Sequence, residues 1–98
     1  MKKLILTIVL ISLGLAVTAQ TAEEYFNRGV SKRILKDYKG AIADYSKVIG
    51  INPNDAVAYY NRGLSKYYLG DYYGACKDAR KAQELGGDVS QFINAECN

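Results

Sequence analysis

An internal repeat with a period of 34 residues restricts the architecture of this chain more than any other feature. When residues 22–55 are aligned with residues 56–89, fourteen of the 34 positions are identical. The clearest copies are YFNRG at residues 25–29 and YYNRG at residues 59–63. A repeat of this length is typical of solenoids, in which each unit is one supersecondary motif that stacks on its neighbours. The sequence therefore predicts two similar structural units in tandem.

Apolar side chains recur at helical spacing inside each unit, without the alternation of a strand. Phe26, Val30 and Ile34, for example, follow one another at four-residue intervals. Thr21, with Glu24 three residues later, has the pattern of a capping box at a helix start. We expect two helices in each unit and a further short helix over residues 88–97, capped by Asp88. The predicted fold class is all-α, a solenoid of two helix-turn-helix units with a C-terminal capping helix.

The first nineteen residues have the layout of an export signal. Lys2 and Lys3 precede an apolar run over residues 4–17, and small residues follow up to Ala19. This run is shorter than the roughly 20 residues that cross a bilayer. We expect a signal peptide over residues 1–19 and a periplasmic or secreted domain over residues 20–98. The alternative is an uncleaved N-terminal anchor, the one route by which we expect contact with a membrane.

Charge and composition limit the possible functions. The whole chain has a net charge of +3. Without Lys2 and Lys3 the remaining domain is nearly neutral and lacks the basic block of a nucleic-acid-binding protein. Histidine is absent, and the sequence has neither a glycine-rich phosphate loop nor a cluster with metal-ligand spacing. We therefore expect no catalytic residues, no metal site and no cofactor.

Taken together, these residues resemble the tetratricopeptide repeat, a helix–turn–helix unit of 34 residues. The repeat has an aromatic residue, a glycine, a small residue, a second aromatic residue and a proline at set places. The second unit of this chain departs from the pattern at the last two places. The first unit has Tyr25, Gly29, Ala41, Tyr45 and Pro53, and the second has Tyr59, Gly63, Ala75, Ala79 and Gly87.

The resemblance implies repeat units at residues 22–55 and 56–89 and a function in protein–protein interaction. We expect a peptide or protein segment as the partner. The alternative is a structural subunit that self-associates, or that stacks on another repeat protein in an envelope complex. A physical motive for that alternative is that repeat arrays need about three units for stability.

In the family, side chains of the first helix of each unit line a concave face. The resemblance therefore implies an apolar binding strip with several tyrosines. The competing interpretation is that some of these side chains pack between helices. We expect no carboxylate clamp, because its positions hold Phe26/Tyr60 and Val30/Leu64. The expected partner-binding residues are Phe26, Val30, Arg33, Ile34, Tyr60, Leu64, Tyr67 and Tyr68.

Two arginine–aspartate combinations also repeat with the period of the chain. Arg28 and Asp44 in the first unit recur as Arg62 and Asp78 in the second. Because each arginine lies on a predicted first helix and each aspartate on a second, we expect an ion pair inside each unit. The alternative is that the arginines bind an acidic ligand.

Cys76 and Cys97 are the only cysteines. They lie at similar distances, about 13 Å along the helices, from the predicted corner between the last two helices. An antiparallel arrangement would place them at the same level, and an oxidising compartment favours a disulfide bond. Two buried thiols and a redox-active pair are the alternatives.

Overall fold

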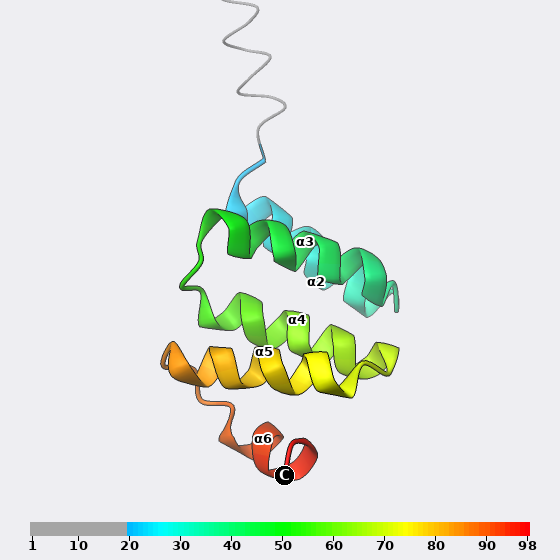
Figure 1. Cartoon of the computed structure of the whole chain (residues 1–98). Helices are drawn as coiled ribbons and strands as arrows, with labels where there is room; N and C mark the ends of the chain where they lie inside the picture. Colours follow the sequence, from blue (N-terminus) through cyan, green and yellow to red (C-terminus); the bar gives the residue numbers. More distant parts are fainter. Residues whose placement is uncertain (1–19) are drawn as a thin grey trace, which may run out of the picture.

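The computed structural model describes residues 20–98, which form five α-helices and contain no β-strand. Each helix packs against the next one in the chain. Figure 1 shows them as a stack, with α2 behind α3 at one end and α6 at the other. The predicted all-α fold is therefore confirmed. The helices are α2 (Ala22–Ile34), α3 (Tyr38–Ile51), α4 (Ala56–Leu69), α5 (Tyr72–Glu84) and α6 (Ser90–Glu96).

The predicted signal peptide over residues 1–19 lies outside the described residues. Among residues 20–98, no helix is long and apolar enough to cross a membrane.

Side-chain oxygens cap four of the five helices. The Thr21 hydroxyl accepts a hydrogen bond from the Glu24 amide at 3.1 Å. Three aspartates cap the next helices in the same way, each through the amide three residues ahead. The predicted cap of the last helix is wrong, because α6 begins at Ser90 without a side-chain cap. The Asp88 carboxylate instead accepts a hydrogen bond from the Ser90 hydroxyl.

Small residues bring the two helices of each hairpin close together. A Cβ atom on Gly29 would lie 2.9 Å from the Tyr45 ring, and one on Gly63 would lie 3.0 Å from the Ala75 carbonyl oxygen. A Cβ atom on Gly29 would require the ring to move, and one on Gly63 would require the α5 backbone to shift by a few tenths of an ångström. The Tyr45 ring is fully buried and fills the first hairpin.

The second hairpin is completed by the capping segment. Ala79 stands where the first unit has Tyr45, so this hairpin contributes much less side-chain volume to its own core. Val89 and Ile93 supply apolar surface there and form one buried cluster with Ala79 and Ala82. The last helix is therefore part of the hydrophobic core of the second hairpin.

Candidate partner-binding site

The expected binding residues of α2 line up along one side of that helix. Phe26 and Val30 are half-buried, and the Phe26 ring lies 5.6 Å from the Tyr45 ring. Ile34 is largely exposed. Arg33 is half-buried, and its Nε has no hydrogen-bond partner within residues 20–98. The α2 part of the strip thus combines apolar surface with one cation.

A hollow of about 380 Å³ lies beside Phe26. Its walls come from the start of α2, the end of α3 and the start of α4. Val57 of α4 is 57% exposed there and is a lining residue that sequence reasoning missed. The remaining lining residues are Ala22, Glu23, Val48, Asn52 and Asp55.

The expected binding residues of α4 divide into two groups. Tyr60 and Tyr67 contact the Phe92 ring of α6, with ring centroids 6.0 and 5.7 Å away. The Tyr67 hydroxyl also donates a hydrogen bond to Glu96 Oε2 at 2.9 Å, and this bond is the main cause of the raised pKa of Tyr67. These two tyrosines therefore pack against the capping helix, which was the competing interpretation.

Leu64 and Tyr68 form the second group. Leu64 is half-buried, whereas Tyr68 is mostly exposed. The Tyr68 ring stacks on Tyr38 of α3 with centroids 5.4 Å apart. We call the uncovered residues of both helices the first-helix face. It consists of Phe26, Val30, Arg33, Ile34, Val57, Leu64 and Tyr68.

A bidentate ion pair joins the two helices of each hairpin. Arg28 donates from Nε and Nη2 to the Asp44 carboxylate at 2.9 and 2.7 Å. Arg62 donates from the same two atoms to Asp78, at 2.8 Å each. Both aspartates are buried. Because a guanidinium fork matches the two oxygens of a carboxylate, such pairs fix helix orientation.

A lysine adds a second cation to each of these pairs. Lys32 Nζ lies 3.1 Å from Asp44 Oδ2, and Lys66 Nζ lies 2.9 Å from Asp78 Oδ2. The sequence showed that both lysines recur, but it did not predict this contact. Each lysine follows the arginine by four residues and so lies one helical turn further along the same side.

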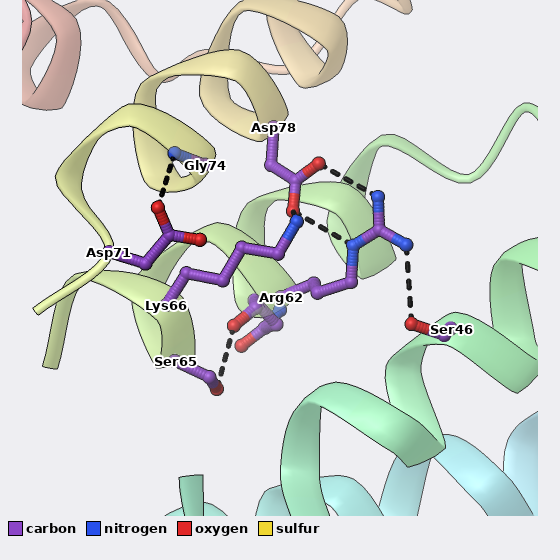
Figure 2. Close-up of polar contacts among 8 residues, drawn as sticks. Ser46, Arg62, Ser65, Lys66, Asp71, Gly74 and Asp78 are labelled. Atoms are coloured by element: carbon purple, nitrogen blue, oxygen red, sulfur yellow. Dashed lines mark hydrogen bonds and ion pairs between the residues drawn. The ribbon is translucent and has the colours of Figure 1, made fainter. Parts of the chain in front are cut away.

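The second ion pair also connects the two hairpins. Figure 2 shows the Arg62 guanidinium between Asp78 of α5 and Ser46 of α3. Its Nη1 donates to Ser46 Oγ at 3.2 Å. The arginine therefore holds three helices, α3, α4 and α5, in register. The predicted ion-pair residues therefore contribute to the scaffold.

Charge pairing shifts two pKa values in the first hairpin. The hydrogen bonds from Arg28 hold the pKa of Asp44 below its ordinary value of 3.8, and burial opposes this effect. The same hydrogen bonds raise the pKa of Arg28. A carboxyl group with a lowered pKa stabilises the fold above its unfolded pKa, and this stabilisation disappears as the pH falls through the folded value.

Acidification should therefore weaken the fold in a way that depends on Asp44. We expect the free energy of unfolding of the purified protein to fall below about pH 4. The Asp44→Asn variant should show a smaller fall, because its side chain no longer takes up a proton. Urea denaturation across the acidic range measures both slopes. Equal slopes for the two proteins would contradict this assignment.

The two cysteines fasten α6 to α5. The sulfur atoms of Cys76 and Cys97 lie within bonding distance, and their Cα atoms are 5.6 Å apart. The Arg80 guanidinium donates a hydrogen bond to the Cys97 carbonyl oxygen at 3.1 Å. The disulfide therefore closes the end of the chain against the second hairpin.

Residues 20–98 contain no group of three or more acidic, cysteine or histidine side chains that could hold a metal ion. The arginine, lysine and aspartate residues described above form the ion pairs that join the two helices of each hairpin. In each cluster two cations surround one buried carboxylate, an arrangement that links the helices of a hairpin.

Comparison with known proteins agrees with the geometry of the hairpins. The family model described as TPR repeat, the tetratricopeptide repeat, matches residues 29–70. A search of curated proteins found no match to the chain. Tetratricopeptide repeats are generally non-catalytic and mediate protein–protein interactions. Residues 29–70 are therefore similar to the tetratricopeptide repeat, and the packed helical hairpins of the structure are consistent with that similarity.

Proposed function

We propose that this chain is a non-catalytic, exported interaction module that binds a peptide or protein segment on its first-helix face. The observation that carries the proposal is the uncovered apolar surface of that face. Phe26 and Val57 border a hollow, and Val57 and Tyr68 are mostly exposed. Exposed apolar side chains that gather around a hollow are typical of a docking surface.

The proposed mechanism is passive. The hairpins are held by ion pairs, by the buried Tyr45 ring in the first and by the cluster around Ala79 in the second, so the face needs no rearrangement before a partner binds. A preformed surface loses little conformational entropy on binding. The layout of residues 1–19 supports export, and an oxidising compartment would preserve the disulfide between Cys76 and Cys97.

The two ends of the stack argue against the alternative of a subunit that stacks on itself. On α4, which packs against both α3 and α5, Ala58 is fully buried. The equivalent position on α2 holds Glu24, which is exposed. A second copy stacked there would have to bury this carboxylate, at a high desolvation cost. At the other end, α6 already covers the second hairpin.

Loss of the apolar surface should weaken binding of the natural partner. We expect Phe26→Ser and Val57→Ser each to lower the affinity by about tenfold or more, as is found for central interface residues. The protein would be immobilised to capture its partner from the native envelope fraction, and the affinity of the captured protein would then be measured. Val57→Ser is the safer variant, because Phe26 also contacts Tyr45.

Leu35→Ser is the matched control. Leu35 is exposed at the end of α2 but lies outside the first-helix face, so its replacement should leave the affinity unchanged. Tyr60 and Tyr67 are unsuitable as test positions, because both also contact the capping helix. A partner that binds both serine variants as tightly as the unchanged protein would refute the proposed face.

A further inference from the structure

A cleft on the α4–α5 hairpin is separate from the first-helix face. It has a volume of about 530 Å³, within the range of roughly 300 to 1,000 Å³ that is common for ligand sites. Tyr59 and Arg62 come from α4. The other lining residues recur every three or four positions along one side of α5. They are Tyr73, Lys77, Asp78, Arg80, Lys81 and Glu84.

The cleft carries an excess of positive charge in a domain that is otherwise close to neutral. Four of its lining side chains are cationic and two are carboxylates. Asp78 is already paired with Arg62, and Glu84 lies 3.5 Å from Lys81 Nζ. Lys77 and Arg80 have no carboxylate partner within residues 20–98. A ligand that brought negative charge would therefore complement the cleft.

The first hairpin provides an internal comparison. The residues that hold both hairpins together are shared, as in Arg28/Arg62 and Asp44/Asp78. Lys81 recurs as Lys47 in the first hairpin, but four other exposed residues that line the cleft are not shared. The first hairpin folds in the same way without them, so packing does not require them. At the positions of Tyr73, Lys77, Arg80 and Glu84, the first hairpin has Lys39, Ala43, Ser46 and Gly50.

Two aromatic rings give the cleft apolar surface as well as charge. Tyr73 is 82% exposed. The Arg62 guanidinium lies over the Tyr59 ring, 5.4 Å from its centroid, and so holds that ring in place. Tyrosine and arginine are the residue types most enriched at the energetic centres of protein interfaces.

We propose that this cleft binds an acidic segment of a protein partner. The carboxylates of the segment would lie beside Lys77 and Arg80, and a neighbouring apolar side chain would pack on Tyr59 and Tyr73. A protein segment fits better than a nucleic acid, because Lys77 and Arg80 are the two lining cations without a carboxylate partner in the described residues, too few to follow a continuous phosphate backbone. The proposal goes beyond the first-helix face, since the two sites share no residue.

Selection from a displayed library of random eight-residue peptides tests this site with the purified native protein. The selected peptides should be enriched in aspartate and glutamate next to aromatic or aliphatic residues. Lys77→Glu should weaken their binding by about tenfold or more, since it places like charges together. Their affinity should also fall when the salt concentration is raised from about 50 mM to about 500 mM.

Three controls make the result specific. Lys47→Glu makes the same charge change on α3 and should keep the affinity within about twofold, because Lys47 is exposed and is not among the residues that line the cleft. Phe26→Ser should also leave it unchanged, which separates this site from the first-helix face. Lys77→Ala introduces the residue that the first hairpin has there, so it should weaken binding without unfolding the protein.

The proposal is overturned if the selected peptides are not enriched in acidic residues, or if Lys77→Glu binds them as well as the unchanged protein. It is also overturned if single-stranded DNA or inorganic phosphate displaces the peptides at lower concentration than a free acidic peptide does. Those outcomes would assign the cleft to another anion or to no ligand.

Discussion

Replacing Asp78 by Ala is expected to lower the free energy of unfolding by about 3–5 kcal/mol, the usual loss when one member of a buried ion pair is removed. The Asp78 side chain is 4% exposed and forms ion pairs with both Arg62 and Lys66. Without it, two cations remain in a site that water reaches poorly. Because small domains have a total stability of about 5–15 kcal/mol, this loss should be plain in urea denaturation.

The first hairpin offers a matched control for Asp78. Asp44→Ala removes the equivalent carboxylate, but Arg28 is 46% exposed whereas Arg62 is 20% exposed. Water can therefore solvate the freed Arg28 more completely, and we expect a smaller loss for Asp44→Ala. An equal or larger loss in the first hairpin would contradict this account of burial.

A rescue variant tests the cause of the loss directly. In a protein that carries Arg62→Met and Lys66→Met, the change Asp78→Ala should cost much less, because no unpaired cation is left behind. Replacing a complete buried ionic group by apolar residues is often neutral or stabilising. If Asp78→Ala is as costly in this background as alone, the loss arises from packing and not from charge.

The repeat made the scaffold predictable from sequence. Gly29 and Gly63 recur because close helix packing is needed at the same place in both hairpins. Arg28, Arg62 and their aspartates recur for a similar reason, since each pair spans one hairpin. The same residue type recurs wherever the same packing or ion pair is needed in both hairpins. The structural roles of these residues could therefore be inferred from the sequence.

Features outside the period were harder to predict. The role of Tyr60 and Tyr67 depends on where α6 packs, and the sequence of α6 has no counterpart in the first unit. The start of α6 was misplaced for the same reason, because its position is set by Val89 and Ile93 in the core and not by a cap at Asp88.

The cleft on the α4–α5 hairpin depends on residues that differ between the two units. Lys77 interrupts the repeat and has no structural task in its hairpin, so helix periodicity drew no attention to it. The first hairpin has Ala43 at the equivalent position and folds in the same way. This comparison shows that the Lys77 side chain is not needed for the hairpin to form. In a repeat protein, positions that differ between structurally equivalent units are the better indicators of function.

Removal of the disulfide is expected to cost about 3 kcal/mol of unfolding free energy in the chain-entropy model. Cys76 and Cys97 are 21 residues apart in sequence, and their bond closes a loop that contains the whole of α6. The double variant Cys76→Ser, Cys97→Ser avoids the intermolecular bonds that a single cysteine would form. Urea denaturation of the oxidised protein and of the double variant measures the difference.

The location of the loss follows from the packing of α6. A helix of seven residues is not stable alone, because helix nucleation is costly. Without the disulfide it depends on Val89 and Ile93 in the core and on the Phe92 ring against α4. Hydrogen exchange should therefore accelerate first in α6, whereas amides of α2 and α3 should keep their protection until global unfolding.

Reduction of the disulfide in the unchanged protein shows whether the loss of stability comes from the missing bond or from the serine substitutions themselves. A reducing agent should destabilise the unchanged protein to the level of the double variant and leave the double variant unaffected. Two free thiols in the protein purified under air from its native compartment would show that the cap is held by packing alone. In that case, the Phe92 ring would cover Tyr60 and Tyr67 through its packing alone, without help from a bond between Cys76 and Cys97.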